Sequence, residues 1–302
     1  MFSTQKGAAR LSLIAIGGLI VLKVGVALPT MSISILAQAM DSLLDIAAVI
    51  ITFFALNIAA RPADEDHRFG HGKVENIAAI AQAVLIFTAA ILIIYSAVRR
   101  IITGTTIELT EAGIGVMAVS IIVSFFLSRH LHRVSRATDS IALEASARNI
   151  TADIYSATGV MCGFVAIRFT GLSILDPIIA LAVTAFILKA GFDVMRKSFG
   201  GLIDEKLPQA EEDKIISCIN EHSERLVDFH KLRTRRAGSQ RYIDLHLVMP
   251  KDTSIAEAHR VADQIEQAIA DCLNNSSVII HIEPCDETCE QCPIPSKRQD
   301  RR

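Results

Sequence analysis

Two aspartates, Asp41 and Asp45, lie four residues apart in the apolar stretch "QAMDSLLDIAAVIITFF", residues 38–54. Residues four apart are neighbours on one face of a helix. The stretch is apolar enough to lie in a bilayer, where each carboxylate costs roughly 2.5–3.5 kcal/mol. Two adjacent carboxylates also repel each other, so the pair predicts either a shared proton or a bound cation.

A later apolar stretch repeats this spacing in "NITAD", with Asn149 and Asp153. Carboxylate and amide oxygens from two helices would make a compact site for a divalent cation. The alternative is that the acidic groups pair with a membrane cation, Lys23 or Arg148. The repeated spacing in two separate stretches favours the metal site.

Two further groups of residues have metal-binding side chains. In "DEDHRFGHGK", Asp64, His67 and His71 are spaced so that one zinc-like ion could reach all three, although an ordinary solvated loop is the alternative. The C-terminal part contains a second group, in which residues two apart on a strand share a face. Its members are His230, His246, His259, His281 and Glu283. Taken singly, each of these histidines is typical of an ordinary surface or core residue. Their combination with carboxylates inside the membrane favours metal binding.

The composition indicates a membrane protein. The chain has 302 residues, of which 51% are hydrophobic and 21% charged, and its mean hydropathy is +0.41. A formal charge of −2 gives no sign of a nucleic-acid partner. The six cysteines form no disulfide framework, which indicates a reducing cytoplasm for the C-terminal part. The N-terminus resembles a signal peptide, but five more apolar segments follow, so we expect it to be a membrane helix.

Six stretches are long enough to span a bilayer, which takes about 20 apolar residues. They are residues 11–28, 33–60, 74–98, 112–134, 140–168 and 174–198. One set of flanking segments, including a loop expected at 129–136, contains Lys6, Arg10, Arg61, Arg68, Lys73, Arg129, Arg133 and Arg136. The opposite set contains Arg99, Arg100 and Arg168. The excess predicts that both termini are cytoplasmic, in a multi-pass membrane protein.

From Asp204 onward, charged residues alternate and no further span occurs. A helix is expected after Pro208, strands near 226–236 and at "RYIDLHLVMP", a helix from the N-cap Ser254 to about 272, and a strand at "SSVIIHIEP". This α-β-β-α-β order predicts a small α+β domain with an antiparallel sheet. The expected regions are 1–10 (cytoplasmic N-terminus), 11–203 (six-helix transmembrane domain), 204–284 (cytoplasmic domain) and 285–302 (disordered tail).

The motifs "DSLLDIAA", "ADEDHRFGHGKVEN", "LIDEKLP", "LRTRRAG" and "VIIHIEPC" resemble those of the cation diffusion facilitators, and most closely the bacterial zinc/ferrous-iron efflux pumps. The resemblance runs from the first span to about Cys285. It implies six spans in a bacterial inner membrane, a cytoplasmic ferredoxin-like domain and a homodimer. It also implies export of a divalent metal in exchange for protons by alternating access. The implied substrates are zinc, iron, manganese or cadmium, with zinc-like ions also in cytoplasmic regulatory sites.

Carried over to this sequence, the resemblance implies a transport site, a loop site, a cytoplasmic cluster and a charge interlock. The first three consist of the residues already named, with the cluster's two metals lying across the dimer interface. The interlock is Lys73 with Asp204. Two positions depart from the family: Asn149 stands where zinc-selective members place His, and Glu283 replaces Asp. The amide makes the transport site all-oxygen, which favours Mn²⁺ or Fe²⁺, although helix geometry can still favour zinc or cadmium.

Other functions remain as alternatives. The main alternative is a membrane-bound metal sensor or scaffold that binds without transport. An intramembrane aspartyl protease is disfavoured because "NITAD" supplies an amide and not a second aspartate in a glycine-flanked break. We therefore expect no enzyme activity. In "CDETCEQC", Cys285, Cys289 and Cys292 could form a thiolate metal site or simply be solvated, and their resemblance to an iron–sulfur spacing is taken as coincidence.

Overall fold

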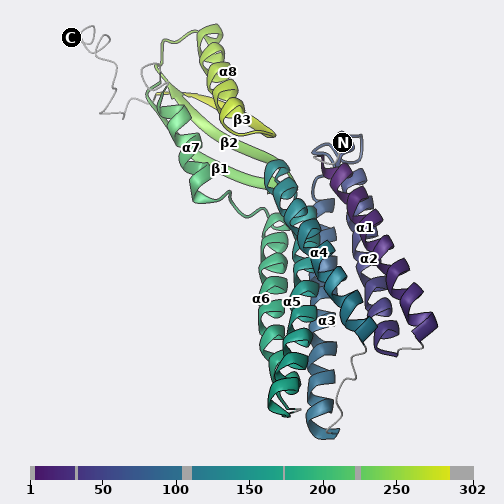
Figure 1. Ribbon diagram of the computed structural model, residues 1–302. Helices are drawn as coiled ribbons and strands as arrows, with labels where there is room; N and C mark the ends of the chain where they lie inside the picture. Colours follow the sequence, from purple (N-terminus) through teal and green to yellow (C-terminus); the bar gives the residue numbers. More distant parts are fainter. Residues whose placement is uncertain (1–3, 31–32, 104–110, 173, 222–225, 286–302) are drawn as a thin grey trace. The chain divides into compact units, whose positions relative to one another are not determined.

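The computed structural model describes residues 4–30, 33–103, 111–172, 174–221 and 226–285. The chain divides into two compact units, residues 1–200 and 201–302. Figure 1 labels the helices and strands of both. The first unit is helical, and the second combines helices with a small sheet, as the sequence predicts.

Six long helices form the first unit. They are α1 (Gln5–Thr30), α2 (Ile33–Ala59), α3 (Val74–Thr103), α4 (Glu111–Thr138), α5 (Ile141–Thr170) and α6 (Leu175–Leu202). Among the described residues, α1, α3, α4, α5 and α6 are each long and apolar enough to cross a membrane. In α2 the apolar part that could be tested, Asp45–Ala59, is shorter.

The charged segments at the helix ends are helical, contrary to the sequence prediction. The expected loop at 129–136 is wrong, because Arg129, Arg133 and Arg136 lie in the last turns of α4. Arg99 and Arg100 likewise lie inside α3 and not in a connection. Arginine has a good helix propensity and a long apolar stem that can reach the membrane surface, so these helices continue past the stretch that spans hydrocarbon.

A tight turn joins α4 to α5. Asp139 adopts a left-handed conformation with φ 52°, and Ser140 follows as the N-cap of α5. The Ser140 hydroxyl oxygen accepts a hydrogen bond from the backbone N–H of Leu143 (3.3 Å). This turn sets α4 against α5, and α5 also packs against α2 and α3. Helix α5 therefore has neighbours on several sides within the first unit.

Buried polar side chains hold several helices together where α3 and α5 begin and α6 ends. Glu75, 2% exposed, accepts a hydrogen bond from the hydroxyl of Ser140 (2.5 Å). The amide of Asn76 donates to the backbone carbonyl of Ser198 (3.0 Å). Buried polar groups are costly unless they are hydrogen-bonded, so these bonds constrain how α3, α5 and α6 can pack.

Two glycines allow close helix packing. A Cβ at Gly159 of α5 would lie 3.0 Å from Val183 Cγ2 of α6, and one at Gly191 of α6 would lie 3.0 Å from Ile86 Cγ2 of α3. Small residues let helix backbones approach closely in membranes. At both crossings a side chain of the neighbouring helix therefore occupies the space beside the glycine.

The second unit has the predicted α-β-β-α-β order. Its elements are α7 (Gln209–Asn220), β1 (Asp228–Ala237), β2 (Gln240–Met249), α8 (Ile255–Cys272) and β3 (Ser276–Pro284). The N-cap prediction for α8 is confirmed, because the Ser254 hydroxyl accepts from the Glu257 backbone N–H (3.2 Å). The fully antiparallel sheet is wrong: β1 and β2 are antiparallel, but β2 and β3 are parallel. Helix α8 carries the chain back along the sheet, so β3 runs in the same direction as β2.

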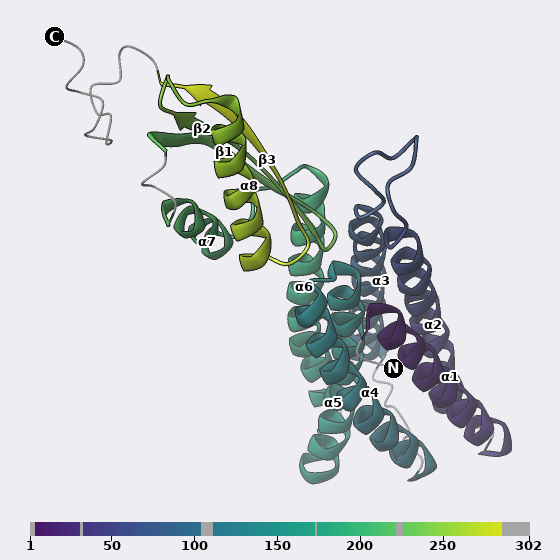
Figure 2. The ribbon, with the colours of Figure 1, turned by 90° about the horizontal axis from the view of Figure 1, so that it is seen from above.

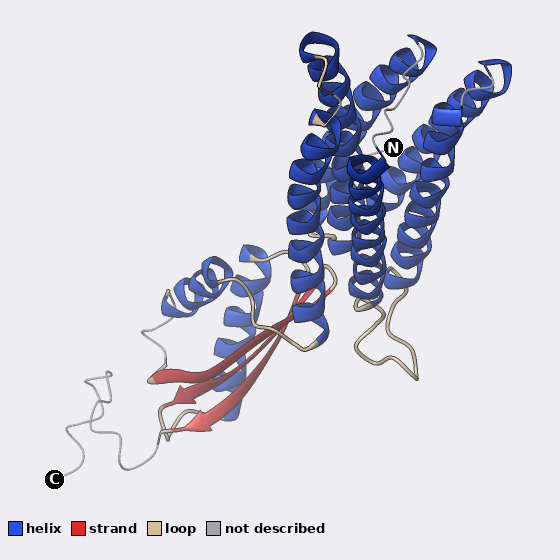
Figure 3. Ribbon diagram, turned by 90° about the horizontal axis from the view of Figure 1, so that it is seen from below, coloured by secondary structure: helices blue, strands red, loops and turns tan. Residues whose placement is uncertain are grey.

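The sheet has one face covered by helices. Residues 243, 245, 247 and 249 of β2 are buried and share a hydrophobic core with α7 and α8, while the alternate residues are only partly buried. Figures 2 and 3 show both helices on the same side of the three strands. The opposite face carries His246 and its neighbours on β1 and β3.

Candidate metal centres

A cavity of about 290 Å³ lies among α2, α3, α5 and α6 of the first unit. Asp45 reaches it from α2, and Asn149 and Asp153 reach it from α5. Most of the remaining lining is apolar and comes from α3 and α6. The structure therefore brings three of the four predicted transport-site residues to one cavity. Asp41 lies in α2 one turn before Asp45, but its side chain is outside the described ones.

The three side chains offer only oxygen ligands. Asn149 and Asp153 are one turn apart, which places both on one face of α5. Neighbouring Ile150 and Ala152 are buried, at 2% and 7% exposed, and hold this part of the helix in the packing of the unit. An apolar cavity with a few convergent oxygen ligands has the composition of a small-ligand site.

The membrane arginine that offered an alternative explanation is engaged elsewhere. Arg148 forms ion pairs with Glu144 of its own helix (3.3 Å) and with Asp193 of α6 (3.8 Å). Glu144 also pairs with Lys197 of α6 (2.5 Å). The other proposed cation, Lys23, donates a hydrogen bond to the hydroxyl of Ser42 (2.6 Å). This bond does not decide whether Lys23 also pairs with the acidic groups, so that pairing stays an alternative.

The loop between α2 and α3 gathers Asp64, His67 and His71, with one possible ligand atom from each within 4.8 Å of the others. Asp64 Oδ1 lies 3.2 Å from His67 Nδ1, and Asp64 Oδ2 lies 3.3 Å from His71 Nε2. Gly70, with φ 77°, makes the turn between the two histidines. Two imidazoles and one carboxylate fit a zinc-like ion that keeps an open coordination position.

The hydrogen bonds of the loop keep Asp64 ionised. Its pKa is lowered mainly because the His67 backbone N–H donates to the carboxylate (2.7 Å), with further contributions from the His67 and His71 side chains. The other ring nitrogen of His71, Nδ1, is buried and has no hydrogen-bond partner in the described part of the chain. A ligating histidine usually has a partner on its second nitrogen, so this atom is the least satisfied part of the loop site.

The sheet of the second unit aligns three histidines, one from each strand. In the strand register His230 is opposite His246, and His246 is opposite His281. Ring centroids are 5.4 Å apart for the first pair and 4.7 Å for the second. A bulge in β1 between His230 and Arg233, with Lys231 at φ 52°, follows directly after His230. Bulges commonly redirect side chains beside a site.

Glu283 completes this cluster. Its carboxylate lies 2.6 Å from His246 Nδ1, 3.1 Å from His230 Nε2 and 3.7 Å from His281 Nε2. The hydrogen bond with His246 is the main cause of a lowered pKa for Glu283. One atom each of His230, His246 and Glu283 lie within 4.8 Å of one another, which is close enough for one metal ion.

Other predicted residues lie away from these clusters. His259 is on α8, 71% exposed at its side chain, and pairs with Asp263 of the same helix (3.4 Å). Lys73 and Asp204 belong to different units, so their interlock stays a prediction. Asp204 pairs with Arg235 of β1 (3.4 Å).

The cysteines add little to the metal sites. Within the described residues Cys285 forms no disulfide, while Cys289 and Cys292 fall outside the described residues. Burial raises the pKa of the Cys218 thiol to about 12, with the neighbouring Cys272 adding to the shift. Metal binding requires a thiolate, so Cys218 is a poor candidate ligand.

Comparison with known sequences decides the family. Residues 9–203 match the sequence model described as the cation efflux transmembrane domain, and residues 207–285 match the cation efflux protein cytoplasmic domain. The chain belongs to the cation efflux family, the cation diffusion facilitators. These proteins are transporters, so the activity of this chain is export of a cation across a membrane.

Individual relatives of this cation efflux protein cover most of its length. An uncharacterized transporter of Synechocystis sp., sll1263, is 34% identical over 88% of this chain and 86% of its own length. The cation-efflux pump FieF of Salmonella typhimurium is 34% identical over 85% of each chain. A solved structure of the transporter CzrB is 37% identical over 26% of this chain and 99% of that one, with a TM-score of 0.26, too low for a comparison of folds.

Sequence reasoning missed several residues near the cavity of this cation efflux protein. Arg100, Ser96 and Ser156 line it together with the predicted ligands. From the sequence, Arg100 is predicted only to flank a membrane span. Its spacing offered a signal, because Ser96 and Arg100 are four apart on α3 and so share a helix face.

Proposed function

We propose that this cation efflux protein exports a divalent metal ion from the cytoplasm in exchange for protons. The observation that supports the proposal is the convergence of Asp45, Asn149 and Asp153 on one cavity of the helical unit. Asp41 would complete the set as a fourth ligand from α2. Three carboxylates and one amide supply enough negative charge to offset the loss of metal hydration.

Protons drive the exchange because they compete with the metal for the same oxygens. Carboxylates bind metal only when they are deprotonated, so metal and proton occupancy are linked with opposite sign. When the cavity faces the cytoplasm, metal displaces protons. When it faces outward, an inward proton gradient displaces the metal. Rocking of helices around a fixed site is the expected form of alternating access.

The ligand set favours harder ions. An amide oxygen at Asn149 replaces the softer imidazole that zinc-selective relatives are expected to have there. We therefore propose Mn²⁺ or Fe²⁺ as better substrates than Zn²⁺ or Cd²⁺. FieF of Salmonella typhimurium is named a cation-efflux pump, which agrees with export and does not specify the ion.

The other centres would serve regulation. We propose that the loop site of Asp64, His67 and His71 and the sheet cluster of His230, His246, His281 and Glu283 bind zinc-like ions. The sheet face that carries the cluster lies opposite α7 and α8 and would meet a second copy in a homodimer. His259 lies on α8, which covers the other face of the sheet, so we propose that it reaches the cluster only from the second copy of the homodimer.

The arrangement in the membrane follows from the charges. We propose that residues 204–284 form a cytoplasmic regulatory and dimerisation domain and that both termini lie in the cytoplasm of a bacterial cell. We propose that Lys73 and Asp204 form an ion pair, as the resemblance implies. If that pair is partly buried, removal of one partner should cost more than the pair contributes.

Metal-dependent proton flux in proteoliposomes tests the proposal. Purified wild type and Asn149→His would be compared with Mn²⁺, Fe²⁺, Zn²⁺ and Cd²⁺, and Asp45→Ala would be the inactive control. We expect wild type to move Mn²⁺ or Fe²⁺ best. Asn149→His should shift the preference towards Zn²⁺ by at least about 10–100-fold, the range for losing a group that only orients a metal ligand.

Each other outcome has a defined meaning. A wild type that already prefers Zn²⁺ would show that helix geometry outweighs ligand hardness, and the selectivity proposal would be wrong. Tight metal binding without flux of any ion would contradict transport and favour a membrane-bound sensor.

A further inference from the structure

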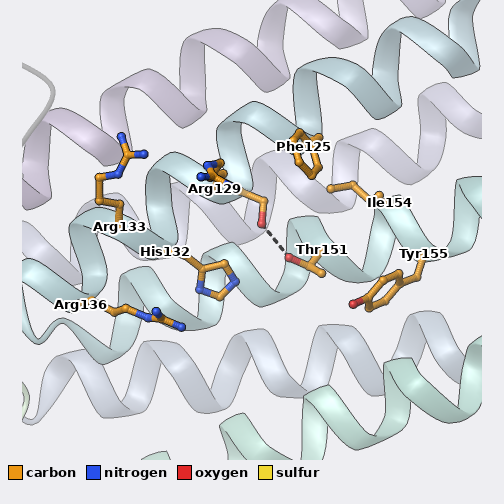
Figure 4. A pocket seen from close by; sticks show the side chains of 9 residues that line it. Phe125, Arg129, His132, Arg133, Arg136, Thr151, Ile154 and Tyr155 are labelled. Carbon is orange, nitrogen blue, oxygen red and sulfur yellow. Dashed lines mark hydrogen bonds between the residues drawn. The ribbon is translucent and has the colours of Figure 1, made fainter.

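A second hollow in the helical unit lies between α4 and α5, with a volume of about 700 Å³. Figure 4 shows its lining, with basic side chains towards one end and Phe125, Ile154 and Tyr155 towards the other. None of the proposed metal ligands lines it. We propose that this groove binds the headgroup and upper acyl chain of an anionic phospholipid.

The basic end is built by one face of α4. Arg129, His132, Arg133 and Arg136 line the groove, and their separations of three, four and seven residues place them together on a helix. All three arginines are exposed. In the described part of the chain none of them has an acidic partner, in contrast to Arg148 nearby, which pairs with Glu144 and Asp193.

This charge selects an anion. Three guanidinium groups without counter-charges would repel a divalent metal, so the groove is a poor path for the transported ion. Guanidinium binds phosphate oxygens through paired hydrogen bonds, which makes arginine a favoured phosphate ligand. Basic residues at the membrane surface each contribute about 1 kcal/mol to attraction of anionic lipid.

The rest of the groove fits a lipid better than a soluble anion. Arg129 and Arg136 are seven residues apart, about 10 Å along the helix axis. From there the lining continues to Phe125, Ile154 and Tyr155, which a free phosphate would not use. Phe125 and Tyr155 are 51% and 47% exposed, and a hydrocarbon chain beside them would be in contact with apolar surface.

Hydrogen bonds between α4 and α5 hold the base of the groove together. The Ser128 hydroxyl donates to the backbone carbonyl of Ala147 (3.1 Å) and lies 2.7 Å from the Thr151 hydroxyl, which is drawn as a dashed line in Figure 4. These contacts pin α4 to α5. Helix α5 thus supplies Thr151 and Ile154 to the groove and Asn149 and Asp153 to the cavity.

The basic end lies at a membrane surface. Helix α4 ends at Thr138, whose carbonyl accepts a hydrogen bond from Gln5 at the start of α1 (3.3 Å). Ser198, near the end of α6, lies at the same end of the unit. The amide of Asn76 donates to the Ser198 carbonyl, and Glu75, beside Asn76, accepts from Ser140 directly after the α4 turn. Residues 207–285, which match the cytoplasmic domain model, follow α6 in the chain, so the anionic lipids expected there are those of the cytoplasmic leaflet.

A second copy of the chain is a weaker candidate occupant. A two-fold interface presents the same patch on both subunits, so two surfaces of the same positive charge would meet. Lipid phosphate supplies the missing negative charge, and a symmetric partner does not.

Lipid binding to the purified full chain tests the proposal. Native mass spectrometry would give the affinity for phosphatidylglycerol and for phosphatidylcholine, with glycerol phosphate as the free headgroup competitor. The triple variant Arg129→Gln/Arg133→Gln/Arg136→Gln would be compared with Lys6→Gln/Arg10→Gln/Arg61→Gln. The control removes the same charge from exposed residues that do not line the groove.

We expect wild type to bind phosphatidylglycerol at least about tenfold more tightly than phosphatidylcholine. The groove variant should lose about 100-fold in that affinity, and the control less than about threefold. If the triple variant does not fold, the single variant Arg133→Gln should still lose about fivefold.

Three results would overturn the proposal. Equal losses in the groove and control variants would indicate general surface charge. Equal affinity for both lipids would exclude headgroup selection. Competition by glycerol phosphate as strong as that by phosphatidylglycerol would indicate a free-anion site in place of a lipid site.

Discussion

The cavity of the helical unit and the cluster on the sheet gather candidate metal ligands in opposite ways. In the cavity, Asp45, Asn149 and Asp153 come from two helices and offer only oxygen. On the sheet, His230, His246 and His281 come from three paired strands and offer mainly imidazole nitrogen. Under the proposed function, all-oxygen ligands suit an ion that is released, whereas imidazoles on a rigid sheet suit an ion that stays bound.

The two regions also differ in what holds the ligands in place. On the sheet, the strand register alone puts the histidines side by side, and the buried core behind them comes from alternate residues of the same strands. In the helical unit, the ligands meet only if α2 and α5 pack correctly around α3 and α6. The sheet cluster should therefore tolerate changes elsewhere in the chain better than the cavity does.

The largest effects should come from removing one ligand in each region. Asp153→Asn should reduce metal-dependent proton flux by at least about 100-fold and leave zinc binding to the sheet intact. His246→Ala should reduce zinc affinity of the sheet by about 10–100-fold and lower flux only in part. Proteoliposome flux and zinc titration of the purified full chain measure the two quantities, with Asp66→Asn, an exposed loop acid, as control.

A complete loss of flux in His246→Ala would show that the two regions are not separate in function. The contrast between a releasing site and a holding site would then fail.

A smaller effect is expected on stability when the N-cap serines of α8 and α5, Ser254 and Ser140, are replaced. Ser254→Ala removes an exposed N-cap and should cost about 1 kcal/mol of stability. Ser140→Ala removes a buried cap and also the hydrogen bond to Glu75, so the cost should rise to about 2–3 kcal/mol. Thermal unfolding of the full chain, with Ser→Thr at each position as the control that keeps a hydroxyl, checks this. Equal costs would mean that the Glu75 bond adds nothing.

The smallest effect concerns pH at the sheet. The hydrogen bond with His246 lowers the pKa of Glu283. The carboxylate of Glu283 therefore contributes to folding stability above the ordinary carboxyl pKa, and this contribution is lost only as pH falls through the lowered pKa. Between pH 7 and 5 the carboxylate stays ionised. Glu283→Gln should therefore weaken zinc binding by about tenfold without changing its pH dependence in this window.

Zinc titrations at several pH values, in an Asp64→Asn background that removes the loop site, measure this prediction. A flatter pH dependence in Glu283→Gln would show that Glu283 takes up a proton within the window, contrary to the lowered pKa.

Much of the architecture could be predicted from local pattern. The apolar stretches set six helices, the capping box starts α8 at Ser254, and "SSVIIHIEP" forms β3 at Ser276–Pro284. These features depend on residues close in the chain. The ends of α3 and α4 were less predictable, because hydropathy stops at the hydrocarbon edge while the helix continues through Arg100 and Arg136.

The sequence by itself determined the ligand types and their spacing along each element: Asp45 on α2, Asn149 and Asp153 one turn apart on α5, and His281 and Glu283 two apart on β3. Only the tertiary structure decided which elements meet. It placed α8 so that β3 runs parallel to β2, aligned His281 with His246, and brought Arg100 to the cavity wall. The reason is physical, since periodicity fixes a residue's direction from its own backbone, while contacts across elements depend on packing that distant parts of the chain make together.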